Sequence, residues 1–193
     1  MSTSLFAIII GAIFVNNFIL TRFLGLCPFF GVSKKTKPAI GMGLAVIFVV
    51  TMASVVTWLV YNLVLVPLHI QYLQIIVFIL VIATLVQFVE LFLKRYNLFL
   101  YKALGIYLPL ITTNCIVLGI ALLNVQEGYS FIQALVFGIA GPVGFALALL
   151  LMSGIRERLE LSKVPKAFQG LPIAFIVASL MSMAFLAFSG IIQ

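Results

Sequence analysis

The sequence predicts an all-α integral membrane protein with six transmembrane helices, from its composition, its lack of charge and the spacing of its apolar segments. Hydrophobic residues make up 65% of the chain, and the mean hydropathy is +1.34, whereas soluble domains are about 45–50% apolar. Charged residues make up only 8%, too few to solvate a globule of 193 residues. Six apolar segments are each near or above the ~20 residues that cross a bilayer as a helix. They cover residues 5–27, 39–63, 71–93, 98–123, 130–153 and 170–192.

The first and fourth segments are expected to be broken helices. Each lies in an apolar run of 28 residues, 5–32 and 98–125, which would be about 42 Å long as a straight helix against about 30 Å of hydrocarbon. Tilt would absorb part of this excess, but glycine and proline also supply breaks. These residues are Gly25, Pro28, Gly31, Gly105 and Pro109. The breaks are therefore expected within 23–31 and 107–114. The first segment has no basic stretch before it and no cleavage pattern after it, so it should remain as a helix.

The other four segments are expected to be continuous spans. Small residues open the second and occupy the fifth, where they allow close helix packing. They are Gly41, Gly43, Gly138, Gly141 and Gly144. Six spans divide into three plus three, so two similar halves would form an inverted-topology repeat. The chain is thus one transmembrane domain, 1–193, with repeat 1 at about 1–93 and repeat 2 at about 98–193.

Basic residues alternate between the connections and set the orientation. Ten of the eleven Lys and Arg residues fall in the first, third and fifth connections. They are Lys34, Lys35, Lys37, Lys94, Arg95, Lys102, Arg156, Arg158, Lys163 and Lys166. Connections rich in Lys and Arg face the cytoplasm. The chain should therefore cross the inner (cytoplasmic) membrane several times, with both termini on the outer side. The eleventh, Arg22, is expected to extend to the cytoplasmic interface. The net charge of +7 reflects these loops and does not indicate nucleic-acid binding.

Cys27 and Cys115 are the only cysteines, and each lies at one of the two expected breaks. Non-helical backbone at membrane depth must be buried in protein or line a cavity, and thiolate is a soft metal ligand. A free cysteine is otherwise a small buried hydrophobe, but matching positions in two halves favour a shared site. Iron–sulfur clusters normally need four cysteines. If these two are ligands, the others must come from a partner, and a related protein facing this one is the form that the internal repeat suggests.

Other features of the sequence limit the chemistry. It contains no phosphate-binding glycine loop, no His/Asp/Glu cluster and no nucleophile beside a base. We therefore expect no flavin or nucleotide site and no complete active site in this chain. The charged turn 156–160 is a candidate docking face for a soluble partner.

Several motifs closely resemble the A-subunit family of the Rnf complex. They are VNNF at 15–18, FLGLCPF at 23–29, GVSKK at 31–35, ALGIYLPLITTNC at 103–115, GIRER at 154–158 and FSG at 188–190. The related E subunit of the sodium-pumping NADH:quinone reductase is the alternative, but it differs in the first motif. There, an acidic residue is expected at the position of Asn17 and no proline follows the cysteine.

The resemblance implies a subunit of a membrane translocase that moves electrons between reduced ferredoxin and NAD, coupled to Na⁺ or H⁺ transport. It implies that Cys27 and Cys115 supply half the ligands of an intramembrane [2Fe–2S] cluster, shared with the homologous Rnf E subunit of opposite orientation. Flavins and further iron–sulfur clusters would belong to other Rnf subunits. The residues alone leave two other classes open, a small-solute transporter with inverted repeats and a structural anchor whose cysteines only pack.

Overall fold

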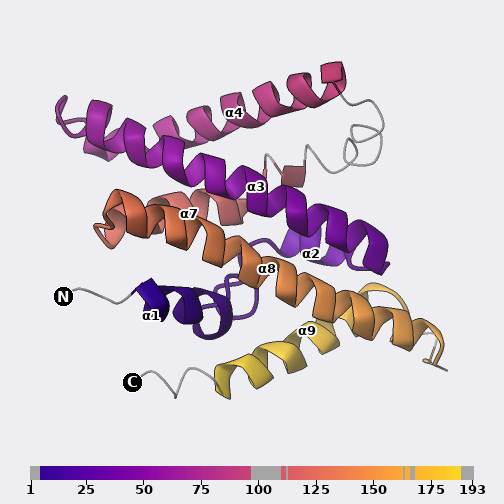
Figure 1. Ribbon diagram of the computed structural model, residues 1–193. Coiled ribbons are helices and arrows are strands. Elements are labelled where there is room, and N and C mark those ends of the chain that lie inside the picture. Colours follow the sequence, from indigo (N-terminus) through magenta and orange to yellow (C-terminus); the bar gives the residue numbers. More distant parts are fainter. Residues whose placement is uncertain (1–4, 97–109, 112, 163, 166–167, 188–193) are drawn as a thin grey trace.

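The computed structural model describes residues 5–96, 110, 111, 113–162, 164, 165 and 168–187, and this part of the chain is helical without strands (Figure 1). The elements in chain order are α1 (Leu5–Ile10), the π-helical η1 (Gly11–Val15), α2 (Leu26–Val32), α3 (Thr36–Val60), the π-helical η2 (Tyr61–Leu65), the 3₁₀-helical η3 (Gln71–Leu73), α4 (Gln74–Tyr96), α7 (Cys115–Gln126), α8 (Phe131–Glu160) and α9 (Leu171–Leu186). The prediction of an all-α fold is confirmed.

Among the described residues, three helical stretches are long and apolar enough to cross a bilayer, namely Thr36–Leu65, Gln71–Leu91 and Phe131–Glu160. They match the second, third and fifth predicted segments. The sixth segment contains α9, a shorter apolar helix of 16 residues.

The first segment is broken, as its length predicted, but the break lies earlier in the chain than expected. Helical structure ends at Val15 and resumes at Leu26, so the break covers residues 16–25 and only its end overlaps the predicted range. Pro28 does not break the chain, because it is the third residue of α2. A proline in the first turn of a helix loses only an N–H group that has no partner in the helix.

The fourth segment is also interrupted beside its cysteine. Leu110 and Ile111 are helical, Thr113 lies in a turn, and α7 begins anew at Cys115. The remainder of the predicted break, at 107–109 and 112, lies outside the described residues. Because α7 has 12 residues, Cys115 lies about 18 Å from its other end.

The packing of α3 against α8 forms the centre of the fold (Figure 1). The two helices are antiparallel, because Gly43 lies against Ala146 whereas Ser54, further along α3, lies against Gly138. Glycine at these positions lets the helix backbones approach closely. The prediction that small residues pack the second and fifth spans together is therefore confirmed for Gly43 and Gly138.

A buried hydrogen-bonded chain ties α7 to this central pair. Nδ2 of Asn124 donates to Oγ of Ser54 at 2.7 Å, and Oγ of Ser54 donates to the carbonyl oxygen of Ala134 at 2.9 Å. Both side chains are almost fully buried. Hydrogen bonds between apolar helices fix their relative position. The bonds of Asn124 and Ser54 therefore fix the position of α7, which begins at Cys115, along the α3–α8 pair.

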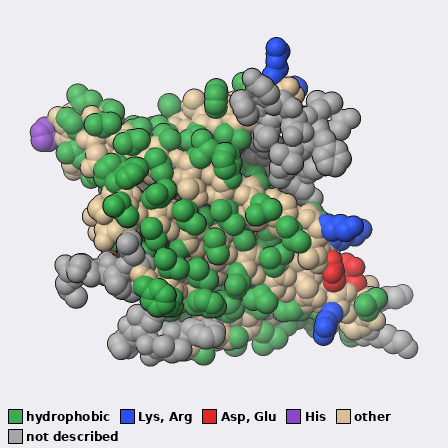
Figure 2. All heavy atoms as spheres, viewed as in Figure 1, with side chains coloured by type: hydrophobic (Ala, Val, Ile, Leu, Met, Phe, Trp, Pro, Cys, Tyr) green, Lys and Arg blue, Asp and Glu red, His purple; other side chains and the backbone are tan. Residues whose placement is uncertain are grey.

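Charged side chains gather at one end of the molecule. In the view of Figure 2 the coloured Lys, Arg, Asp and Glu side chains lie at the end where α3 begins and α8 ends, and the single histidine lies at the opposite end. Hydrophobic side chains cover much of the surface between them. This distribution is the one that the alternation of basic connections predicted.

Arg22 is the exception among the described basic residues, and the prediction that it extends to the same interface as the others is wrong. It lines a hollow of about 300 Å³ together with Glu127 and Tyr129, at the turn that joins α7 to α8. The reason is the break after Val15, because the chain no longer advances along a helix axis between Val15 and Arg22. Burial raises the pKa of Tyr129 above its ordinary value; Glu127 raises that pKa further, and Arg22 lowers it.

Gly138→Ala is expected to destabilise the protein, because the added Cβ would lie 2.7 Å from both Cβ and Oγ of Ser54. Overpacking costs about 1–3 kcal/mol, against about 1 kcal/mol that alanine gains over glycine within a helix. Gly154→Ala on the same helix is the control, since no described atom lies within 4 Å of its added Cβ. Thermal unfolding in detergent compares the two variants. A Tm for Gly138→Ala equal to that of Gly154→Ala would contradict the packing.

Candidate metal centre

Asn17 holds open the break in the first segment. Its side chain is fully buried, and Nδ2 donates to the carbonyl oxygens of Ile13 at 3.2 Å and Gly144 at 2.8 Å. Oδ1 accepts from the backbone N–H of Ile19 at 3.1 Å. The amide thus replaces backbone hydrogen bonds that the break removes, so the irregular chain is satisfied inside the protein. The sequence marks Asn17 only as part of the motif at 15–18 and as a position where two related families differ, and its structural role in the break was missed.

Two residues with positive φ then turn the chain into α2. The angle is 55° at Phe23 and 85° at Gly25. A Cβ at Gly25 would be strained by this angle and would also lie 2.9 Å from the ring of Phe145. Only glycine fits both requirements. Because α2 begins immediately afterwards, Cys27 is its second residue.

Asn114 shapes the second break in a related way. Its Oδ1 accepts from the backbone N–H of Ile116 at 3.2 Å, which caps the start of α7. Cys115 is the first residue of that helix. Nδ2 of Asn114 is buried and makes no hydrogen bond to the described part of the chain. This donor belongs to the residue immediately before Cys115.

The two breaks meet at the cysteines. The backbone N–H of Gly25 donates to Sγ of Cys115 at 3.0 Å, across 90 positions of the chain. Cys27 follows Gly25 by two residues, and both cysteines are exposed. From this point α2 leads to the start of α3 and α7 to the start of α8, so the two short helices run to opposite ends of the molecule (Figure 1). The sequence predicts that the two breaks bring Cys27 and Cys115 close together, and the contact between Gly25 and Cys115 confirms that the breaks meet. Metal binding by the thiols stays a prediction.

The described residues contain no complete metal site. No group of three or more His, Cys, Asp or Glu side chains within the described residues could hold a metal ion. The site as the chain presents it consists of two exposed thiols, a backbone N–H donor to one of them and the start of α7. The N-terminal end of a helix carries a partial positive charge, which favours an anionic group there.

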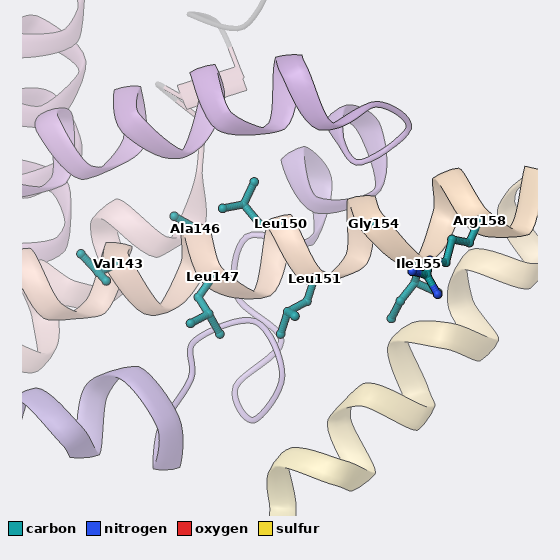
Figure 3. Close-up of a pocket in the computed structure, with 8 residues that line it drawn as sticks. All are labelled: Val143, Ala146, Leu147, Leu150, Leu151, Gly154, Ile155 and Arg158. Atoms are coloured by element: carbon teal, nitrogen blue, oxygen red, sulfur yellow. The ribbon is translucent and has the colours of Figure 1, made fainter.

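A hollow of about 680 Å³ along α8 has different properties (Figure 3). The residues that line it follow a helical spacing and are apolar except at one end. They are Val143, Ala146, Leu147, Leu150, Leu151, Gly154, Ile155 and Arg158. Phe145, whose ring faces Gly25, is fully buried on another side of α8. The hollow therefore faces away from the cysteines and offers no group for redox or metal chemistry.

Comparison with known proteins identifies the family. Residues 5–192 match the family described as Rnf-Nqr subunit, membrane protein. The chain belongs to the Rnf–Nqr family. The resemblance seen in its sequence motifs is thereby confirmed.

Relatives of this Rnf–Nqr chain cover almost its whole length. It is 59% identical over 189 residues to the A subunit of the ion-translocating oxidoreductase complex of Syntrophotalea carbinolica, covering 98% of each chain. It is 57% identical over 187 residues to the A subunit of the Na(+)-translocating ferredoxin:NAD(+) oxidoreductase complex of Acetobacterium woodii, covering 97% of each. It is 53% identical over 191 residues to the A subunit of the ion-translocating oxidoreductase complex of Edwardsiella ictaluri, covering 99% of each.

Proposed function

We propose that this chain is the A subunit of an ion-translocating ferredoxin:NAD⁺ oxidoreductase (Rnf) complex and holds half of an intramembrane [2Fe–2S] cluster. The meeting of the two broken segments, with Gly25 N–H on Cys115 Sγ and both thiols exposed, carries this proposal. The names of the relatives support the assignment to the complex, because the alignments with these relatives span nearly all of both chains. The chain would then be one subunit of a translocase and would have no complete active site of its own.

The residues present fit such a cluster. A [2Fe–2S] cluster is normally held by four cysteine thiolates, of which Cys27 and Cys115 would supply two. Negative charge within a membrane is costly, and the start of α7 at Cys115 and the Gly25 N–H group would both offset part of this cost. When bound, the cluster accepts and passes on single electrons inside the membrane. This chain positions two ligands for it.

The other two cysteines would come from the homologous Rnf E subunit of opposite orientation. The exposure of both thiols supports a shared site, because ligands that complete a centre with another chain must face that chain. Flavins and further clusters would lie in other Rnf subunits. The coupling ion is Na⁺ or H⁺.

The order of elements supports two inverted repeats of three spans each, at about 1–93 and 98–193. In each half a break precedes a cysteine that lies in the first turn of a short helix, α2 or α7. A helical stretch of 30 residues follows in each, Thr36–Leu65 and Phe131–Glu160, and these two stretches are antiparallel. Six spans in one domain would follow from this arrangement.

The chain would lie in the inner membrane with Met1 and Gln193 outside. In intact cells, a cysteine at Lys35 in a chain without its native cysteines is expected to resist an impermeant thiol reagent, because basic connections stay in the cytoplasm. A cysteine at His69, an exposed position at the other end, is the matched control and should be labelled. Labelling at 35 with protection at 69 would contradict this orientation.

A small-solute transporter is less well supported by the contacts. Such a protein needs polar groups near the midplane that are free to bind substrate. The amide of Asn17 is instead occupied by backbone groups of Ile13, Gly144 and Ile19. Asn17 is thus structural.

Co-expression tests the proposal. The chain purified alone is expected to carry no stable cluster, because two thiols cannot complete a four-thiolate site. Purified together with the homologous E subunit, the pair should contain iron and inorganic sulfide and show the absorption and electron paramagnetic resonance (EPR) spectra of a [2Fe–2S] centre. A pair without iron, or a full cluster on this chain alone, would overturn the shared site.

A further inference from the structure

We propose that Arg156, near the basic end of α8, is the positioning residue for Cys27. It acts by holding the C-terminal end of α2, the helix of seven residues that carries this cysteine. The importance of that position for electron transfer rests on the proposed function, whereas the position itself can be measured without a metal.

The helix α2 needs support from elsewhere in the chain. Seven residues form fewer than two full turns, and helices this short are not stable alone. Its last carbonyl groups also lack partners within the helix. Phe29 and Val32 are buried, which anchors one face of α2 but does not fix its position along its own axis.

Arg156 supplies this axial restraint. Its Nη1 donates to the carbonyl oxygen of Phe30 at 3.0 Å and to Oγ of Ser33 at 2.8 Å. The Arg156 side chain is 8% exposed and Ser33 is fully buried. Hydrogen bonds from a charged donor are about twice as strong as neutral ones. Removal of the guanidinium would leave both acceptors without this donor in a buried place, which is unfavourable.

The residues beside Arg156 on α8 contact Thr36, which lies just after the end of α2. The backbone N–H of Thr36, the first residue of α3, donates to Oε1 of Glu157 at 2.7 Å. Oγ of Ser153 lies 3.3 Å from Oγ1 of the same threonine. One turn of α8 therefore fixes both the end of α2 and the start of α3.

The other end of α2 also rests on α8. The ring of Phe145 lies against Gly25, immediately before the helix. Positions 145, 149, 152 and 156 are spaced as one face of a helix and are all buried. Along α8, Phe145 and Arg156 are about 16 Å apart, and α2 is held between them. In the turn at 156–160, Arg156 bonds to α2 and the residue after it, Glu157 bonds to the start of α3, and Arg158 is left exposed; docking of a soluble partner there stays a prediction.

The two native cysteines make the test possible, because they are the only ones in the chain and both are exposed. Spin labels on Cys27 and Cys115 of the full chain in lipid bilayers would report their separation through the dipolar broadening of the continuous-wave EPR spectrum, which is sensitive to the short distance between cysteines at one meeting point. A narrow distance distribution is expected for the wild type and a shifted, broader one for Arg156→Met. Arg156→Lys should restore part of the order, because lysine keeps a charged donor. Arg158→Met removes the same charge from an exposed position on the same helix and should change nothing.

Equal distributions in Arg156→Met and Arg158→Met would overturn the positioning role. If Arg156→Met fails to insert, Ser33→Ala removes one acceptor only and should broaden the distribution in the same direction; an unchanged distribution there would overturn the role equally. Iron analysis of the co-expressed pair separates this result from the proposed function. If Arg156→Met changes the distance between the labels but the wild-type pair contains no iron, only the proposed cluster is refuted. If the wild-type pair contains iron but Arg156→Met leaves the distance unchanged, only the positioning role is refuted. In the loaded pair, Arg156→Met should also alter the EPR spectrum of the reduced cluster.

Discussion

Cys27→Ser and Cys115→Ser, made singly, should each stop electron transfer through the assembled complex. Each change would remove one thiolate from the proposed [2Fe–2S] centre, which needs four. The fold should survive, because serine is similar in volume and both positions are exposed, where substitutions usually change stability by no more than about 0.5 kcal/mol. Ferredoxin-dependent NAD⁺ reduction by membranes measures the loss, and thermal unfolding of the purified complex measures stability.

Alanine at the same positions is the companion variant. Serine keeps an oxygen that could bind iron weakly, whereas alanine keeps no donor at all. Cys27→Ala and Cys115→Ala should therefore be at least as inactive as the serine variants. Wild-type electron transfer in either alanine variant would mean that the cysteine in question only packs.

Gly25→Ala should have the second-largest effect, because it disturbs the point where the two breaks meet. A left-handed backbone angle costs a residue with a Cβ about 1–2 kcal/mol. Overpacking against Phe145 adds about 1–3 kcal/mol. The displaced turn should also lose the N–H contact to Cys115 and with it most of the iron in the co-expressed pair.

Gly128→Ala separates the two contributions. Gly128 also has a positive φ, 61°, but no described atom lies within 4 Å of its added Cβ. This variant should lose only the conformational part, about 1–2 kcal/mol, and should keep its iron. Equal destabilisation of the two variants in thermal unfolding, with iron retained in both, would show that Gly25 is not packed against the site.

Segment length and composition predicted the helical class, the three clear spans and the existence of a break in the first run. The position of that break could not be predicted from glycine and proline. It depends on Asn17, whose amide binds the carbonyl of Gly144, a residue 127 positions away. The sequence does not reveal this partner, because only the fold brings α8 beside the break. Pro28 misled the prediction because its effect depends on its position within a helix that begins at Leu26.

The two cysteines, and the approach of the two breaks that carry them, could be predicted from the sequence, but the contact that joins the breaks could not. Gly25 meets Cys115 only through the packing of α2 and α7 around α8. Arg156 was equally hidden. Its sequence neighbours form a charged turn typical of a solvated helix end, and only the fold shows that its guanidinium is buried against Ser33.

Iron content of the co-expressed pair with the double variant Cys27→Ser, Cys115→Ser tests the central claim most directly. The wild-type pair should contain about two irons, as a [2Fe–2S] cluster requires, and the double variant should contain none while both chains are still purified together. A double variant with full iron content and an unchanged EPR spectrum would contradict the claim that this chain provides half of the cluster ligands.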